Sequence, residues 1–342
     1  MLSFLSSLFS PDKSKSGGLD RALIERAIER AVDGTDPRLR ALGNYRKQLR
    51  EPVELAARYI IELVDDLPEA VPFGRKSYST DPRLRAFFAS KDHLQEVLGR
   101  FGTISDYLQG YSGLPPDEIF GLLSVEWKER NILGMQQQGD KVRRDVQQVS
   151  VNFFNHRFVC PSDNEAETSL ELKKRGFDYL LKIALEKISA RRGKHQELKR
   201  EQKLLDKKLA AMKNGGWGLE CMVSAGEEPA PDMGALAAKI DAVEAELLAL
   251  GNASGGLERN LEVLAEVLAQ PAHWVHRDEV RMRMNGRGIR SGASSDEPAN
   301  DLRLIGLFSA IGERRIVVPV RVLRSELPER PDFFKQASRY LG

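Results

Sequence analysis

The chain is poor in cysteine and has no long apolar run. Cys160 and Cys221 are its only 2 cysteines in 342 residues, and they do not form a CxxC pair. A disulfide framework or a zinc knuckle is therefore not expected, and a reducing cytoplasm is the compartment that this cysteine usage favours. No apolar stretch approaches the ~20 residues that a membrane-spanning helix requires.

The chain also lacks an excess of charge and the short motifs of common active sites. Its 52 Lys and Arg nearly balance 50 Asp and Glu, so the net charge of +2 does not indicate a polyanionic partner for the whole molecule. No phosphate loop, GxGxxG after a strand, GxSxG elbow or HExxH helix occurs. The sequence predicts a non-enzymatic protein without a cofactor or metal ion.

The sequence does contain two heptad-patterned segments separated by a glycine-rich stretch. In the first segment, apolar residues recur at the spacing of a coiled-coil seam; they are Leu170, Phe177, Leu181, Ala184, Ile188, Leu198, Leu205, Leu209 and Met212. The second segment keeps the same spacing through Leu236, Ile240, Val243, Leu247, Leu250, Leu257, Leu261, Leu264 and Leu268. These two seams predict a pair of long helices.

The charges of the two segments favour pairing within one chain. Residues 171–213 contain 14 Lys and Arg against 6 Asp and Glu, a net charge of +8, whereas residues 232–266 contain 2 against 7, a net charge of −5. Opposite charge and a short linker predict that residues 163–270 form an antiparallel coiled-coil hairpin. A compact helical bundle is the alternative, and pairing between two chains would use the same seam.

The period of the apolar pattern changes on both sides of this hairpin. Residues 19–113 read as a helical N-terminal domain. Period-two segments in 118–160 and 273–325 predict strands, with turns expected at Lys128–Arg130 and Gln138–Asp140.

These segments predict an α+β fold. Because an antiparallel hairpin returns the chain to its starting point, the strands on either side are expected to share one antiparallel β-sheet or small barrel. The expected architecture is a helical N-terminal domain and this β domain, interrupted by the long antiparallel coiled-coil hairpin. A short C-terminal helix is expected within residues 329–342.

Two apolar segments are candidate partner-binding sites. Residues 1–18 are predicted to be a docking peptide on a flexible linker, able to lie on a membrane surface or in a partner's groove. The turn of the hairpin is unusually apolar for an exposed tip, which is typical of partner sites. The candidate contact residues are Leu5, Leu8 and Phe9 in the peptide and Trp217, Leu219 and Met222 in the turn. Packing of the peptide on its own domain is the alternative.

A seven-residue string, TDPRLRA, occurs at 35–41 and again at 80–86. Its Asp is expected to cap a helix start and its Pro to fit the first helical position. Its arginines stand where the helix dipole disfavours cations, so two such ends placed together would offer an anion site. The candidate residues are Arg38, Arg40, Arg83 and Arg85. Pairing of these arginines with nearby acids is the alternative.

The predicted strands also contain arginines at period two. Arg281, Arg283 and Arg321 are expected on the sheet face opposite the apolar residues, where they could contact nucleic-acid phosphates. An ordinary half-exposed sheet face has the same pattern. His273 and His276 lie three apart at a strand start and would point to opposite sides, so no zinc site is predicted there.

Our leading hypothesis is a cytoplasmic interaction or scaffold protein that binds a protein partner through the coiled-coil arm and the docking peptide. The alternative is a nucleic-acid-associated protein that uses the basic strands and the positive arm. Peripheral membrane contact through the N-terminus and homo-oligomerisation are compatible with both. The discriminating feature is whether the basic residues of the first helix face acids of the second; they are Lys199, Arg200, Lys203, Lys207 and Lys208.

Overall fold

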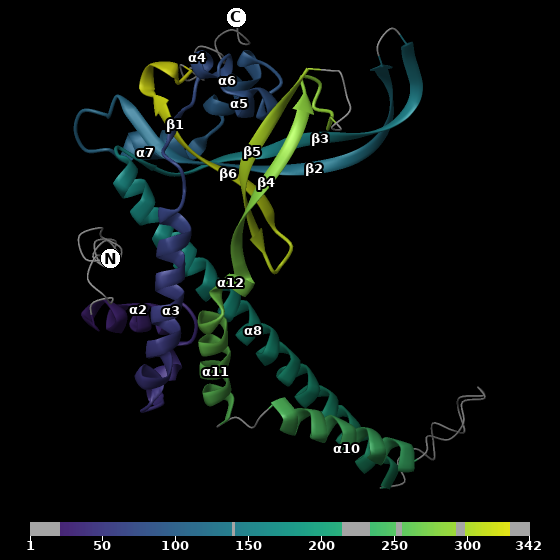
Figure 1. Ribbon diagram of the computed structural model, residues 1–342. Helices are drawn as coiled ribbons and strands as arrows, with labels where there is room; N and C mark the ends of the chain where they lie inside the picture. Colours follow the sequence, from purple (N-terminus) through teal and green to yellow (C-terminus); the bar gives the residue numbers. More distant parts are fainter. Residues whose placement is uncertain (1–20, 139–140, 214–232, 251–254, 292–297, 329–342) are drawn as a thin grey trace, which may run out of the picture. The chain divides into compact units, whose positions relative to one another are not determined.

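The structure is a computed structural model that describes residues 21–138, 141–213, 233–250, 255–291 and 298–328 (Figure 1). The chain divides into two compact units. Of the described residues, those within 58–176 and 271–328 form the sheet unit, and those within 21–57 and 177–270 form the helical unit. The predicted docking peptide, hairpin turn and C-terminal helix lie outside the described residues.

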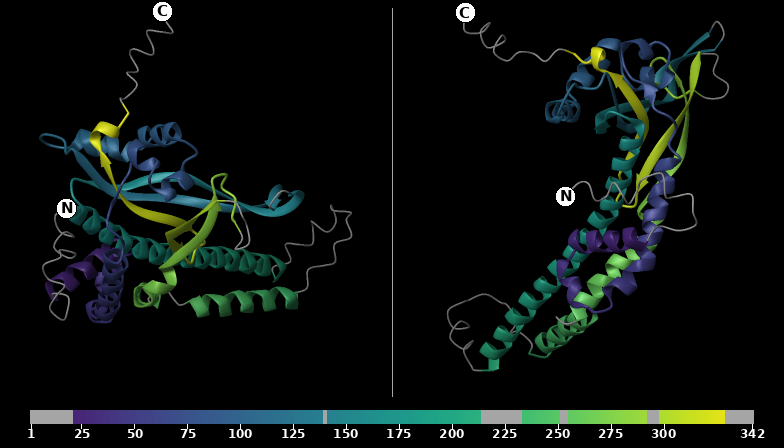
Figure 2. Two further views of the ribbon diagram at one scale, coloured as in Figure 1. Left: turned by 45° about the horizontal axis from the view of Figure 1, so that its top comes forward. Right: turned by 90° about the vertical axis from the view of Figure 1, so that its left-hand side faces the viewer.

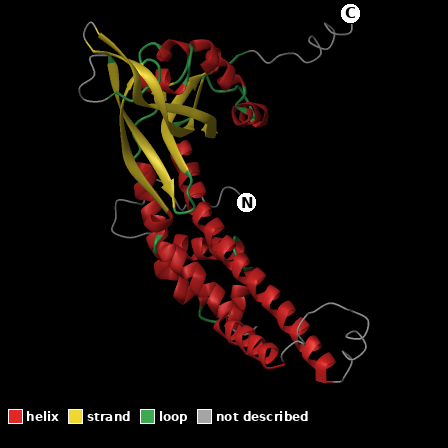
Figure 3. Ribbon diagram, turned by 90° about the vertical axis from the view of Figure 1, so that its right-hand side faces the viewer, coloured by secondary structure: helices red, strands yellow, loops and turns green. Residues whose placement is uncertain are grey.

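The sheet unit is built on one curled, open sheet (Figure 3). Its strands are β1 (Val71–Pro72), β2 (Glu118–Gln138), β3 (Lys141–Ser162), β4 (Val275–Asn285), β5 (Ala299–Ser309) and β6 (Arg314–Leu323). The order is β3-β2-β6-β5-β4 with antiparallel neighbours, and β1 pairs with β6 in parallel. Strands from both sides of residues 163–270 share the sheet, which confirms the predicted α+β class.

Three bulges in β3 account for the curl. At each of its three register shifts with β2, β3 contains one extra residue. A residue with positive φ lies at every one of these shifts: Asp145 at 58°, Asn155 at 51° and Cys160 at 56°. Such bulges bend the strand and increase its twist, so the sheet curls into a half-barrel. Backbone N–H groups of Val151 and Arg290 then bond across to Gly288 and Val149 at 2.8 Å, which ties β3 to the turn after β4.

The predicted turn at Lys128–Arg130 is wrong. β2 runs through these residues and stays paired with β3, with Lys128 opposite Asn152 and Arg130 opposite Ser150. β2 pairs with β6 only as far as Val125, and the side chains of 128–130 are exposed, so a run of charged residues does not end the strand. The second predicted turn, Gln138–Asp140, falls mostly outside the described residues, which resume with β3 at Lys141 after β2 ends at Gln138.

Short helices cover the inner face of the sheet. They are α4 (Arg75–Tyr78), α5 (Pro82–Phe87), α6 (Lys91–Gly99) and α7 (Gly102–Gly110), and the unit also contains α12 (Pro271–Trp274) and η3 (Arg324–Glu326). Phe87, Leu94 and Ile104 from these helices share one core with Leu123 and Val320 of the strands. The contacts of residues 19–113 are thus divided, because 58–113 belong to the core of the sheet unit.

The helical unit contains α2 (Arg21–Asp33), η2 (Pro37–Ala41), α10 (Met233–Leu250) and α11 (Gly255–Ala269), with parts of α3 (Tyr45–Asp65) and α8 (Glu165–Lys213). α3 continues through Pro52. The second heptad segment is divided between α10 and α11.

Burial along α8 changes from a broad face to a narrow stripe. Between Phe177 and Ile188 six side chains are buried: Phe177, Leu180, Leu181, Ile183, Ala184 and Ile188. Farther along, only Leu198 and Leu205 are buried among the described side chains of this helix. The first part of α8 is therefore surrounded by a bundle, and the second part is covered on one side.

The packing of Gly121 gives a testable expectation. A Cβ at Gly121 in β2 would overlap the buried ring of Phe158. Gly121→Ala should lower the free energy of unfolding by about 1–3 kcal/mol, the usual cost of overpacking. Gly102→Ala is the matched control, because a Cβ at Gly102 meets open space. Urea unfolding of both variants measures the difference, and equal stability would contradict the packing of Phe158 on Gly121.

Candidate functional site

The outer part of α8, residues 193–213, packs against α10 through a single apolar seam. Leu198 and Leu205 of α8 form a buried cluster with Ile240 and Val243 of α10. Partly buried side chains extend the cluster at both ends: Leu209, Leu236 and Leu247. The two helices lie side by side and run in opposite directions (Figures 1 and 2). The seam consists of the residues that the heptad pattern marked in this stretch.

Two polar contacts flank the seam. Lys194 Nζ lies 3.3 Å from Glu246 Oε1, and Gln202 donates a hydrogen bond of 2.9 Å to Glu244. Glu262 of α11 instead pairs with Arg259 of its own helix at 2.6 Å. Only part of the acidic charge of the second segment is therefore directed at α8.

The remaining basic residues of outer α8 face solvent. Five exposed side chains form no ion pair with any described carboxylate: Lys199, Arg200, Lys203, Lys207 and Lys208. The positive charge of these five residues is thus not neutralised within the described residues.

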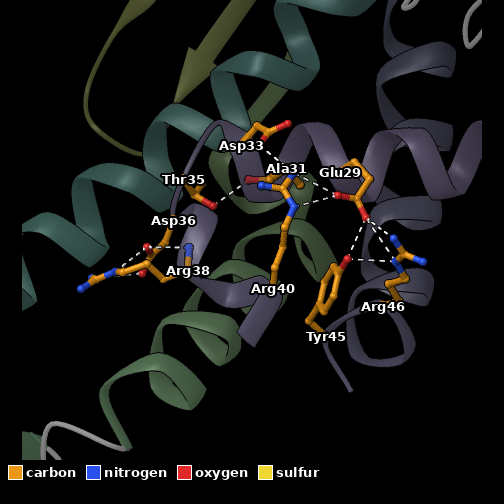
Figure 4. Close-up of polar contacts among 9 residues, drawn as sticks. All are labelled: Glu29, Ala31, Asp33, Thr35, Asp36, Arg38, Arg40, Tyr45 and Arg46. Atoms are coloured by element: carbon orange, nitrogen blue, oxygen red, sulfur yellow. Dashed lines mark hydrogen bonds and ion pairs between the residues drawn. The ribbon is translucent and has the colours of Figure 1, made fainter. Parts of the chain in front are cut away.

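A second polar feature lies where η2, α8 and α11 meet within the helical unit (Figure 4). Asp36 is only 3% exposed and accepts a hydrogen bond of 3.1 Å from Arg38 Nε. It also pairs with Arg192 of α8 and accepts a hydrogen bond of 3.0 Å from Asn260 Nδ2 of α11. One buried carboxylate therefore connects three elements.

The charge of Asp36 is stabilised in this position. Burial alone would raise its pKa, but hydrogen bonds from Arg38 and Asn260 and the charge of Arg192 outweigh burial and lower the pKa. Asn260 Oδ1 is buried without a hydrogen-bond partner among the described groups. The sequence predicted Asp36 as a helix cap, which is confirmed by its bond to Arg38 N, but it did not predict the role of Arg192 or Asn260.

The neighbouring arginine of the same string is also engaged by acids (Figure 4). Arg40 bonds to Glu29 Oε2 at 3.0 Å and to Asp33 Oδ1 at 2.7 Å. Tyr45 and Arg46 donate to the other oxygen of Glu29, each at 2.8 Å. Burial would raise the pKa of Glu29, but these hydrogen bonds lower it. Arg40 thus has a structural role that ties η2 to α2.

The second copy of the string lies in the other unit. Asp81 caps α5 through Arg83 N at 2.8 Å and pairs with the Arg83 guanidinium at 2.7 Å. Arg85 is exposed. Anion binding by Arg38, Arg40, Arg83 and Arg85 stays a prediction, and carboxylates of the same units hold three of the four.

The predicted basic sheet face contains acids among its arginines. Arg281 pairs with Glu279 at 2.6 Å and Arg321 with Glu118 at 3.3 Å. Arg283 is half-buried, and its Nε has no hydrogen-bond partner in the described structure. Two more arginines of this unit also meet glutamates: Arg290 with Glu129 and Arg315 with Glu126. Nucleic-acid binding by this face remains a prediction, and glutamates pair with most of the arginines named here.

Packing contacts hold His276, His156 and the described cysteine. His276 stacks on Phe308, and His156 stacks on Phe88 and contacts the Phe87 carbonyl at 3.0 Å. Burial raises the pKa of the Cys160 thiol to about 12, which keeps it unreactive. Within the described ranges, no group of three or more His, Cys, Asp and Glu side chains is arranged to hold a metal ion.

Two further observations bear on function. None of the helices that the structure describes combines the length and the apolar character needed to cross a membrane. Comparison of the chain with protein-family models, with curated proteins and with solved structures found no match. The predicted contact residues Leu5, Leu8, Phe9, Trp217, Leu219 and Met222 lie outside the described residues.

The buried Asp36 gives a second testable expectation. Asp36→Asn leaves Arg38 and Arg192 without their countercharge, so it should lower the free energy of unfolding by roughly 2–4 kcal/mol. Asp33→Asn is the matched control, because Asp33 also pairs with an arginine but its side chain is 54% exposed. That variant should change stability by less than about 1 kcal/mol. Urea unfolding followed by the helical circular dichroism signal provides the measurement.

Wild type and Asp36→Asn should differ in how their stability depends on pH. The folded pKa of Asp36 is lowered, so its charge stabilises the fold fully above the unfolded value of about 3.9. This contribution is lost as the pH falls through the lower folded pKa. The stability difference between wild type and Asp36→Asn should therefore shrink below about pH 4. A difference that stays constant down to pH ~3 would contradict a stabilising charge on Asp36.

Proposed function

We propose that the chain is a non-enzymatic, cytoplasmic interaction or scaffold protein whose partners bind a coiled-coil arm. The arm consists of residues 193–213 of α8 together with α10, paired as an antiparallel hairpin within one chain. The observation that supports it is the apolar seam of Leu198, Leu205, Ile240 and Val243 in helices that are otherwise exposed. The arm would extend for about 30 Å at 1.5 Å per residue.

The seam is strong enough to hold such an arm together. Burial of a leucine, isoleucine or valine side chain is worth about 1.5–3 kcal/mol, whereas an exposed ion pair contributes about 0–1 kcal/mol. The four seam side chains therefore dominate over the Lys194–Glu246 pair. The flanking contacts are suited to fixing the register of the two helices.

The arm also exposes leucines that its own seam does not need. Leu204 on α8 is 55% exposed and Leu248 on α10 is 68% exposed. Large apolar side chains on the surface of a two-helix arm are suited to partner contact. The docking peptide of residues 1–18 and the turn around Trp217 are the other contact elements of this proposal, so that weak contacts could act together.

The first test asks whether the arm closes within one chain. Lys194→Cys and Glu246→Cys, in a Cys221→Ser background, place thiols on two side chains that lie 3.3 Å apart. A short bismaleimide should link them within one polypeptide, giving a monomer of altered mobility on a denaturing gel. Lys199→Cys with Glu246→Cys is the control, because Lys199 is on the outer side of α8 and should not link. Covalent dimers from the first pair would show that the seam joins two chains.

The second test asks whether the arm binds partners. A photoreactive phenylalanine at Leu204 or at Leu248 should give discrete cross-linked products in living cells. Leu114, which is 94% exposed in the sheet unit, is the matched control and should give none of these products. The mass of each product distinguishes a second copy of the chain from another protein. If the arm positions give no product that the control lacks, the proposed function is wrong.

A further inference from the structure

The outward face of α8 contains a row of basic side chains without partners among the described residues. We define the basic stripe as Lys199, Arg200, Lys203 and Lys207, all of which are exposed. With 100° of rotation per residue, they lie about 110–170° around the helix from the seam residues Leu198 and Leu205. The stripe therefore occupies the side of α8 that is opposite α10.

The acidic residues of the same stretch are kept off this face. Glu197, Glu201 and Asp206 lie within about 90° of the seam direction. In the first part of α8, by contrast, acids and bases alternate and form ion pairs along the helix. Glu171 pairs with Arg175, and Lys182 pairs with Glu186. Positive and negative side chains are thus mixed along the first part of α8 and separated onto different sides of its outer part.

This separation has an energetic cost. Lys199 and Lys203, and Lys203 and Lys207, are four residues apart, and each such like-charge pair destabilises a helix by about 0.2–0.5 kcal/mol. A ligand that brings several negative charges to one side of the helix would remove this repulsion. The complementary partner is a polyanion with closely spaced charges in a straight row.

We propose that the basic stripe docks the phosphate backbone of duplex nucleic acid, independently of base sequence. The stripe spans about 12 Å, and duplex DNA has one negative charge per about 1.7 Å of its axis, so several phosphates lie within reach. Residues 193–213 and 233–250 contain no Phe, Tyr or Trp on which unpaired bases could stack, which favours a duplex over a single strand.

The alternatives have less support. An anionic membrane would favour a broad apolar face beside the charges, and Leu204 is the one large apolar side chain exposed on α8 in the described residues near the stripe. The docking proposal depends on the proposed arm in one respect: α10 must cover the side of α8 that is opposite the stripe. Nucleic-acid binding and photo-cross-linking to partners are measured at different residues, so one can fail while the other succeeds.

Binding of the full chain to a labelled random-sequence duplex of about 30 base pairs tests the proposal by fluorescence anisotropy. Neutralising three or four phosphate contacts predicts a dissociation constant that rises about 40–150-fold between ~50 and ~200 mM salt. Lys199→Gln with Lys203→Gln and Lys207→Gln should weaken binding at low salt and remove most of this salt dependence. Circular dichroism confirms that the variant keeps its helices.

The control variant loses the same number of positive charges, but at lysines outside the arm. Lys47→Gln with Lys91→Gln and Lys128→Gln removes three exposed lysines outside the arm and should leave the affinity within about 3-fold of wild type, since these positions contact no phosphate. The proposal is overturned if the duplex does not bind at low salt, or if both triple variants weaken binding equally. Tighter binding to single strands, or binding to phosphatidylserine vesicles without duplex binding, also overturns it.

Discussion

The helical unit depends on one buried carboxylate. Asp36 has lost its water, so its charge must be met by other groups, and removal of one partner from such a pair is costly. Its partners come from η2, α8 and α11, and all three must be in place together. Arg192 lies in α8 just after the broadly buried stretch that ends at Ile188 and just before the seam that begins at Leu198. Arg192, the α8 partner of this carboxylate, thus lies between the broadly buried stretch of α8 and the stretch that packs on α10.

This transition explains why charge is arranged differently in the two parts of α8. In a bundle, neighbouring helices limit which side chains reach water, and acids and bases then pair along the exposed face, as Lys182 and Glu186 do. In the outer part, α10 covers one side alone, and acids near the seam can satisfy cations of the other helix, as Glu246 does for Lys194. The opposite side is left with lysines and arginine. The proposed arm and the basic stripe therefore both rest on the same observation, the narrowing of the buried apolar face along α8.

Features with a short sequence period were predictable. The three–four spacing marked the seam of α8 and α10, the period-two segments marked one sheet on both sides of residues 163–270, and Asp36 and Asp81 were recognised as caps. Contacts across the bundle were not predictable, since Asp36 is separated from Arg192 by 156 residues and from Asn260 by 224. The sequence offered two signals of a polar contact. Asn260 is a polar residue between Leu257 and Leu261, and the adjacent Arg191 and Arg192 stand at a seam position. Neither signal identifies the residue that it pairs with.

The repeated TDPRLRA string shows how far local sequence determines a site. Both copies cap a helix in the same way, with the aspartate accepting from the backbone N–H two residues on. Their surroundings then differ, because Asp36 receives two partners from distant helices and Asp81 is paired with Arg83. The repeat is therefore a repeated cap, and anion binding by its arginines stays a prediction. The basic stripe matches no such string, and what distinguishes it is that its four side chains form no ion pair with a described carboxylate. The docking surface proposed here was thus identified from uncompensated charge on a helix and not from similarity between two short strings.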